Sequence, residues 1–230
     1  MSERIIHQPS PIEILFPQGL ALLDPKVQGK LPIDIERWIG GFIIEPKWNG
    51  IRAAVEIDNG NIRILTKEGN RVTGLPNLQD RIRRLAGRRT GLVLDGEIIS
   101  GGGKTDRERQ TVINQIFSRG QRETGGIKLI TFDVLMFDGV GLVEFPIEGR
   151  KRALARLIPQ ELQAELNIGV TEFAVENHLT FLEGAMSERF EGIVLKRKKS
   201  RYGEPHPRSG QPHPWFKYKF SPEPRESENP

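Results

Sequence analysis

The sequence contains no cysteine. It therefore has no disulfide framework and no thiolate metal site, and nothing in it points to an oxidising compartment. It also lacks any apolar run near the ~18 residues that a membrane helix requires. Its first residues are too polar for a signal peptide. We therefore expect a cytoplasmic protein with no membrane partner.

The chain does contain enough apolar sequence for a packed domain. Its 230 residues are 37% hydrophobic, and a chain of this length can bury a core without covalent cross-links. Prolines interrupt residues 1–40, which predicts an extended lead-in with a short helix near 33–39. Residues 221–230 are polar and proline-rich, which predicts a disordered tail. We therefore expect the domain to occupy 41–220.

Hydrophobic periodicity within 41–220 predicts more strands than helices. Strands are expected at 41–45, 51–57, 61–66, 92–99, 127–137, 170–175 and 192–195. Helices are expected at 75–85, 110–117, 147–157 and 180–189, the last with Thr180 as its N-cap. Asn59-Gly60 is typical of a hairpin turn, and the glycine-rich segment 100–109 is expected to be a mobile loop. The pattern indicates an α+β fold of antiparallel sheets flanked by helices.

Five short segments combine charged or aromatic residues with apolar strands. They are Glu45-Pro46-Lys47-Trp48-Asn49-Gly50-Ile51-Arg52, Leu94-Asp95-Gly96-Glu97-Ile98-Ile99, Phe132-Asp133-Val134-Leu135-Met136-Phe137-Asp138-Gly139, Glu191-Gly192-Ile193-Val194-Leu195-Lys196 and Trp215-Phe216-Lys217-Tyr218-Lys219. Each segment alone is a weak signal, because a single lysine beside a glycine also fits a solvated strand end. The ordered series is far more specific than any of its members.

In this order the segments resemble motifs I, III, IIIa, IV and V of the adenylation domain of ATP-dependent DNA ligases. That domain belongs to a superfamily with RNA ligases and mRNA capping enzymes. The resemblance covers most of the chain, from Phe42 to Lys219. It implies an ATP-grasp-like nucleotidyltransferase fold in which Lys47 is the catalytic residue that becomes adenylated.

A lysine that is to be adenylated must be surrounded by groups that favour its uncharged form. An amine attacks the α-phosphorus of ATP only when it is uncharged, although the reference pKa of a lysine is about 10.4. Nearby positive charge favours the neutral form, and Arg52, Lys217, Lys219 and a Mg²⁺ or Mn²⁺ ion could supply it. Lys217 and Lys219 are two residues apart on a strand and so share one face, which is either solvent or phosphate. The resemblance assigns them to the α-phosphate and the leaving pyrophosphate.

The remaining site residues are also assigned through the resemblance. It implies that Glu97 binds a ribose hydroxyl or a metal, that Glu191 binds the metal, and that Phe132 stacks on adenine. By pattern alone each glutamate fits a surface acid and Phe132 fits the core. Glu45 is expected to contact the nucleotide. Lys67 stands where the family's motif Ia carries an arginine, and a lysine there keeps the charge but loses the planar fork.

The sequence departs from the family pattern at Asn49, where motif I carries an aspartate. Asparagine keeps a side-chain oxygen but removes a negative charge beside Lys47. We expect reduced rather than abolished adenylation.

Eleven residues follow Lys219, too few for the OB-fold domain that closes over ATP in DNA ligases. We therefore expect an isolated catalytic core, in which lysine adenylation suffers more than the sealing of an adenylated nick.

The net charge of +4 favours polyanionic partners only weakly. Basic residues form two bunches, one at Arg81, Arg83, Arg84, Arg88 and Arg89, the other at Lys196, Arg197, Lys198, Lys199 and Arg201. The first bunch is typical of the solvated face of an amphipathic helix. The second adjoins the Glu191 motif, so we expect a phosphate backbone to pass there.

These observations predict an ATP-dependent DNA ligase core that seals nicks in double-stranded DNA through a lysyl-AMP, in repair or recombination. Another chain could supply an OB-fold or a repair function. DNA is favoured over RNA by Arg52 and by the Trp215 to Lys219 segment. Two alternatives remain open, an RNA ligase and a non-catalytic or partner-dependent nucleic-acid-binding module.

Overall fold

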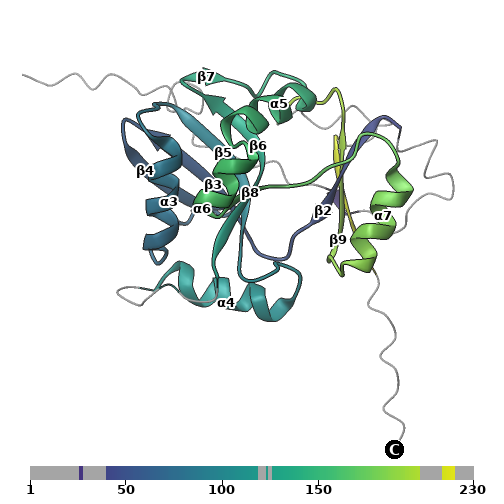
Figure 1. Ribbon diagram of the computed structural model, residues 1–230, viewed down its shortest axis with the longest axis horizontal. Helices are drawn as coiled ribbons and strands as arrows, with labels where there is room; N and C mark the ends of the chain where they lie inside the picture. The colour runs from purple at the N-terminus through teal and green to yellow at the C-terminus, as the bar shows by residue number, and fades with distance from the viewer. Residues whose placement is uncertain (1–25, 28–39, 119–122, 124–125, 203–213, 221–230) are drawn as a thin grey trace, which may run out of the picture.

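The computed structural model of the protein describes residues 26–27, 40–118, 123, 126–202 and 214–220. The helix expected at 33–39, most of the lead-in and the tail at 221–230 lie outside these residues. Within them, two β-sheets lie side by side with helices packed against them (Figure 1). The α+β prediction is confirmed. No helix of the described residues has the length and apolar character needed to cross a membrane.

The larger sheet has six strands in the described residues. Their order is β4 (Asn61–Thr66), β3 (Ile51–Asp58), β5 (Leu92–Ile99), β6 (Lys128–Phe137) and β7 (Val140–Gly141), with β8 (Ile168–Val170) also beside β6. Neighbouring strands run antiparallel, except that β8 is parallel to β6. Four helices add apolar side chains to the core of this sheet: α3 (Pro76–Ala86), α4 (Asp106–Ile116), α5 (Ile147–Leu157) and α6 (Gln160–Leu166).

The smaller sheet joins segments from opposite ends of the described chain. Its order is β1 (Lys26–Val27), β10 (Trp215–Lys219), β9 (Gly192–Arg197) and β2 (Phe42–Lys47). β9 is antiparallel to both β10 and β2, whereas β1 runs parallel to β10. The helix α7 (His178–Ser187) covers this sheet, with Ala185 buried among Ile44, Ile193 and Phe216.

Two of these elements follow directly from local sequence. Between β3 and β4, Asn59 has φ 48° and Gly60 has φ 78°, as a two-residue type I′ hairpin turn requires. α3 buries Leu78, Ile82 and Leu85, which is the spacing of an amphipathic helix. The predicted hairpin and the predicted helix are therefore both confirmed.

Other local predictions are wrong. The segment 100–109 is not all loop, because α4 begins at Asp106, where Thr105 and Glu108 form a capping box. The strand expected at 170–175 is β8, which ends at Val170. α7 begins earlier than expected, and its N-cap is Asn177 in a left-handed conformation rather than Thr180. The helix α6 was not predicted at all.

The chain crosses from the smaller sheet to the larger one between Lys47, the last residue of β2, and Ile51, the first residue of β3. The two sheets share a buried cluster, in which Trp215 of β10 packs with Val93 of β5. Residues 48–50 therefore stand at the junction of the two sheets, where each sheet contributes one wall.

Candidate active site

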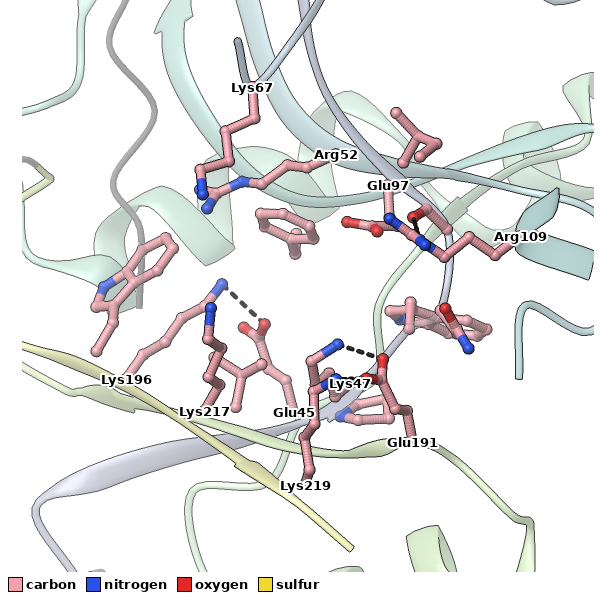
Figure 2. A pocket seen from close by; sticks show the side chains of 18 of the residues that line it. Glu45, Lys47, Arg52, Lys67, Glu97, Arg109, Glu191, Lys196, Lys217 and Lys219 are labelled. Carbon is pink, nitrogen blue, oxygen red and sulfur yellow. Dashed lines mark hydrogen bonds and ion pairs between the residues drawn. The ribbon is translucent and has the colours of Figure 1, made fainter. Parts of the chain in front are cut away.

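A pocket of about 470 Å³ opens at this junction. It is lined by every residue that the sequence predicts for nucleotide or metal binding: Glu45, Lys47, Arg52, Lys67, Glu97, Phe132, Glu191, Lys217 and Lys219. Some come from the smaller sheet and some from the larger, and Figure 2 shows their side chains converging. Segments that are far apart in the sequence thus form one cavity around the Lys47 amine.

The turn that follows Lys47 is tightly packed. The Trp48 indole nitrogen donates a hydrogen bond to Thr171 Oγ1 at 2.9 Å, and its ring meets Phe190 edge-on with 4.9 Å between centroids. Gly50 lies so close to β5 that a Cβ atom there would be 2.2 Å from the Ile98 carbonyl oxygen. A larger residue at position 50 would therefore push the lysine turn away from the sheet.

The Glu191 carboxylate lies between two lysine amines (Figure 2). Lys47 Nζ pairs with Glu191 Oε2, and Lys219 Nζ pairs with Oε1. Burial alone raises the pKa of Glu191, but hydrogen bonds from Lys219 and Lys47 and their positive charges outweigh it and hold that pKa below its usual value. The pocket therefore presents an ionised carboxylate to the predicted nucleophile.

β10 directs two lysines to the pocket. Lys217 and Lys219 both line it, whereas Phe216, which precedes Lys217, is buried in the core beneath α7 and Tyr218, between the two lysines, packs against the same cluster. Lys219 lies opposite Gly192 of β9, where a Cβ atom would be 2.0 Å from the Tyr218 carbonyl oxygen. The alternation expected of a strand is present. The face that the two lysines share opens into the pocket.

Arg52 provides a fixed positive charge on the opposite wall. Its Nε and Nη2 donate to the two carboxylate oxygens of Asp95 at 3.0 and 2.6 Å, and the Tyr202 hydroxyl donates to the same carboxylate at 2.9 Å. Burial lowers the pKa of Arg52, but the paired Asp95 charge outweighs it and raises the pKa overall. Asp95 is thus a supporting residue and orients the guanidinium 5.4 Å from the Phe132 ring centroid.

Glu97 lies opposite Arg52 in the pairing of β5 with β3. Burial raises the pKa of Glu97 to about 7, although the charges of Lys47 and Arg52 oppose the change. Near neutral pH this side chain is therefore divided between its protonated and ionised forms. A cation bound beside it would favour the ionised form.

The described residues contain no group of three or more His, Cys, Asp or Glu side chains placed to hold a metal ion. Glu97 and Glu191 do line the same pocket. Two carboxylates fall short of a closed protein site, but they suit Mg²⁺, which keeps several waters and takes further oxygen ligands from phosphates. The pair therefore fits a metal ion that arrives with a nucleotide.

Glu45 stands at the centre of a buried cluster of charges. Lys151 Nζ of α5 lies 2.5 Å from its Oε1, and Lys196 Nζ of β9 lies 2.8 Å from its Oε2. Burial lowers the pKa of Lys196 to about 8, and the Glu45 charge opposes this change. The Lys196 amine also lies 4.5 Å from the Phe132 ring and 4.1 Å from the Trp215 ring. Lys196 thus lies against the aromatic side chains of the pocket and shares the Glu45 carboxylate with Lys151.

A family model described as ATP dependent DNA ligase domain matches residues 32–219. The chain belongs to this family. The DNA ligase of Methanothrix thermoacetophila is 30% identical over 172 residues, which are 71% of this chain and 30% of that protein. The SPbeta prophage-derived DNA ligase-like protein LigB of Bacillus subtilis is 33% identical over 179 residues, which are 76% of this chain and 60% of that protein.

Solved structures share the fold of this ligase domain. The ligase domain of M. tuberculosis LigD has a TM-score of 0.60 at 24% identity and covers 86% of this chain and 59% of its own. The ATP-dependent DNA ligase of bacteriophage T7 in complex with ATP has a TM-score of 0.55 at 19% identity. The match covers 84% of this chain and 68% of the T7 ligase chain. The present chain spans about a third of the length of several curated DNA ligases that it matches.

The second basic bunch of the ligase domain does not lie wholly at the surface. Lys196 is buried against Glu45, Lys198 donates to two backbone carbonyls at 2.7 and 2.9 Å, and Arg201 pairs with Glu144 at 2.9 Å. Lys196 is therefore removed from the surface, and the passage of a phosphate backbone along the rest of the bunch stays a prediction. The first bunch agrees with the solvated-helix interpretation, since exposed Arg83 and Arg84 of α3 pair with nearby acids.

The ligase domain also has pocket residues that sequence reasoning missed. Asp106 and Arg109 line the cavity from α4. Asp106 Oδ1 accepts a hydrogen bond from Asn49 Nδ2 at 3.0 Å, and Arg109 Nε donates to the Gly50 carbonyl at 3.2 Å. The Thr-x-x-Glu spacing at 105–108 is a helix-start signature. It could have placed these residues at the beginning of a helix instead of in a mobile loop.

Proposed function

We propose that this chain is the adenylation core of an ATP-dependent DNA ligase, with residues 41–220 as the catalytic domain and Lys47 as the nucleophile. The observation that carries the proposal is the position of the Lys47 amine. It contacts Glu191 inside a pocket whose walls also hold Arg52, Glu97 and the β10 lysines. Membership of the DNA ligase domain family supports the same conclusion.

In the first step, the neutral Lys47 amine attacks the α-phosphorus of ATP. A nitrogen–phosphorus bond forms and the nitrogen releases one proton to solvent. The bond from the α-phosphorus to the oxygen that bridges to the β-phosphate breaks, and pyrophosphate leaves with the bonding electrons. Lys217 and Lys219 face this space and are placed to balance the charge that builds up on the phosphate oxygens. Lys67, exposed at the end of β4, serves the outer phosphates.

The aromatic wall binds the nucleoside. Phe132 is only partly buried and lines the pocket, so its ring offers a stacking surface for adenine. Glu45 lines the pocket from the smaller sheet, where it forms ion pairs with Lys151 and Lys196. Arg52 is held by Asp95 beside Phe132 on the wall of the larger sheet, where it contacts the nucleotide without having to be reoriented.

Glu97 and Glu191 would hold Mg²⁺ or Mn²⁺. The ion would supply positive charge that draws the phosphates into line and stabilises the transition state. The chain itself contributes two carboxylates that line the same pocket as Lys47. Glu97 contributes to this binding in its ionised form.

The later steps join DNA strands. An oxygen of a 5′-phosphate attacks the phosphorus of lysyl-AMP, the nitrogen–phosphorus bond breaks, and the amine of Lys47 is restored. A 3′-hydroxyl then attacks the 5′-phosphorus and AMP leaves with the bridging oxygen. We propose nicked duplex DNA as the substrate, in cytoplasmic repair or recombination, with an OB-fold domain or partner protein closing the pocket. Resemblance to DNA ligases supports the choice of DNA over RNA.

Labelling with α-³²P-ATP and Mg²⁺ tests this proposal. The parent should acquire a covalent label that nicked DNA releases together with sealing, whereas nicked RNA should release little. Lys47→Ala should acquire no label, and Lys199→Ala, which changes an exposed lysine outside the pocket lining, should label like the parent. Salt-sensitive DNA binding without any label would instead indicate a binding module, and preferential sealing of RNA would indicate an RNA ligase.

A further inference from the structure

Residues 103–109, called the clamp below, hold the turn that follows Lys47. The Asn49 backbone N–H donates to the Gly103 carbonyl at 2.7 Å. The Asn49 side-chain nitrogen donates to Asp106 Oδ1 at 3.0 Å, and Arg109 Nε donates to the Gly50 carbonyl at 3.2 Å. A single short segment therefore makes three hydrogen bonds to two neighbouring residues of the turn.

The clamp is itself anchored to the larger sheet. The Glu108 carboxylate accepts hydrogen bonds from the backbone N–H groups of Gly102, Lys104 and Thr105 at 2.6 to 2.9 Å, which closes the first turn of α4 as a capping box. Gly103 has φ 66°, and a Cβ atom there would be 2.7 Å from the Ile99 side chain. Further along α4, Val112 and Ile116 belong to the main core. The clamp is thus a fixed support.

The pair formed by Asn49 and Asp106 is chemically specific. Asn49 is 7% exposed, so its side chain has little access to water as a substitute partner. An ionised aspartate can only accept hydrogen bonds, so the amide nitrogen of Asn49, not its oxygen, must face Asp106. The motif quoted above has an aspartate at position 49. Here the carboxylate stands on α4 instead and an amide occupies position 49.

The turn is therefore held from two directions. Trp48 is fixed by Thr171 beyond the end of β8, and Asn49 and Gly50 are fixed by the clamp. Lys47 directly precedes this turn, so a change in the turn alters the direction of its amine. Attack on phosphorus needs the reacting atoms in line, and a misplacement of about 1 Å can slow such a step by about 10²-fold.

We propose that Asp106 is a positioning residue for Lys47, acting through Asn49, and that positions 49 and 106 must provide a hydrogen-bond donor and an acceptor that face each other. This inference rests on the proposed adenylation of Lys47. An aspartate at position 49 of this chain would oppose the Asp106 carboxylate with two acceptors, no donor and two like charges. Exchanging the two residues would restore one donor and one acceptor in the same place.

A reciprocal exchange tests the inference in the full chain. The rate of α-³²P-ATP labelling would be measured for the parent, Asn49→Asp, Asp106→Asn and the double variant. The family motif carries an aspartate at this position, but in this chain Asp106 faces it. We therefore expect Asn49→Asp to label about tenfold more slowly, because the two carboxylates repel and the turn is displaced. Asp106→Asn leaves two amides that can still pair and should be slowed by about twofold to fivefold. The double variant should return to within about threefold of the parent, since the pair is restored.

Two further measurements separate positioning from general stability. Sealing of a nick that already carries a 5′-adenylate does not use the Lys47 amine as nucleophile, so Asn49→Asp should seal it at close to the parental rate. Asp106→Ala, which removes the acceptor without adding a charge, should show the same division between the two steps. Asp80→Asn, on the exposed face of α3, removes the same charge elsewhere and should leave both steps unchanged.

Each result of these experiments either supports or overturns the inference about Asp106. Parental labelling by Asn49→Asp, or a double variant no faster than Asn49→Asp, overturns the inference while the parent still labels. An equal slowing of labelling and of pre-adenylated sealing, with a lowered unfolding temperature, also overturns it, because it indicates general destabilisation. A parent that acquires no label overturns the proposed function and this inference together.

Discussion

Lys47 and Glu191 are 144 residues apart in the sequence and form an ion pair at the centre of the pocket. Pairing of β2 with β9 places Lys47 opposite Gly192, the residue after Glu191. The contact is therefore a consequence of strand register. It joins the proposed nucleophile to one of the two proposed metal ligands.

Replacing Glu191 by glutamine should therefore impair lysine adenylation severely. The amide keeps the shape of the side chain but loses the charge that attracts a metal ion and pairs with two lysines. We expect the labelling rate to fall by about 10²-fold, the loss typical of one missing electrostatic contact in a transition state, and the Mg²⁺ concentration needed for half-maximal rate to rise. Glu188→Gln, on an exposed residue near the same strand, is the matched control. An unchanged Mg²⁺ requirement would contradict the assignment of Glu191.

The raised pKa of Glu97 predicts a dependence of stability on pH. The folded state binds this proton up to about pH 7, whereas an unfolded glutamate loses it near pH 4.3. Between these values the folded protein holds more protons than the unfolded chain, so this group's contribution to the free energy of unfolding falls as pH rises through that window. Glu97→Gln removes the effect. The variant should therefore gain about 3 kcal/mol relative to the parent between pH 4 and pH 8.

Urea unfolding of both proteins at the two pH values measures this difference. Contributions of other titrating groups cancel in the comparison. A gain of the opposite sign would show that charges in the pocket, rather than burial, control Glu97. In the same variant, adenylation should lose most of its activity at every pH if Glu97 binds the metal.

The buried cluster around Glu45 predicts unequal effects of its members on folding. Removing Glu45 leaves the Lys151 and Lys196 ammonium groups buried without a counter-charge. Glu45→Gln should therefore lower the free energy of unfolding by about 3 to 5 kcal/mol. Lys151→Met leaves one neutral ion pair, because Lys196 still contacts Glu45, and should lower it by about 1 kcal/mol or less.

Chemical denaturation at neutral pH distinguishes these two variants. If Lys151→Met were as destabilising as Glu45→Gln, the second lysine would not be the redundant charge that the geometry implies. The Lys151→Met variant also has an expected effect on adenylation. Lys151→Met should keep much of its adenylation activity, because Lys151 does not line the pocket.

Phe132 offers a test of nucleotide stacking that spares the fold. Its ring is only partly buried, beside the cluster that contains Leu135 and Trp215. Phe132→Leu keeps an apolar side chain in that place but removes the flat surface. The ATP concentration for half-maximal labelling should rise about tenfold, equivalent to about 1.4 kcal/mol of stacking and cation–π contact. Initial rates over a range of ATP concentrations measure this half-maximal concentration. If it is unchanged in Phe132→Leu, the adenine base does not stack on Phe132.

The local chemistry of the sequence was sufficient for several features. Asn59-Gly60 specifies a tight hairpin turn, and the Leu78, Ile82 and Leu85 spacing specifies a helix, because both depend on residues within a few positions of each other. The family resemblance selected residues that line a single pocket in the structure, whereas their roles stay predictions. Lys217 and Lys219 could be assigned a common face, but periodicity could not say whether that face met solvent or a cavity.

The remaining features depend on contacts between distant segments. Lys196 belongs to a basic run in the sequence, yet it is buried because Glu45 of the neighbouring strand offers a counter-charge. Asp106 belongs to a polar, glycine-rich stretch, yet α4 brings it to Asn49. Strand alternation and turn preference are local properties that a sequence determines by itself. Which charges meet, and which of them are removed from water, is decided only by the register of β2, β9 and β10 and the position of α4, because electrostatic partners are chosen by distance in space.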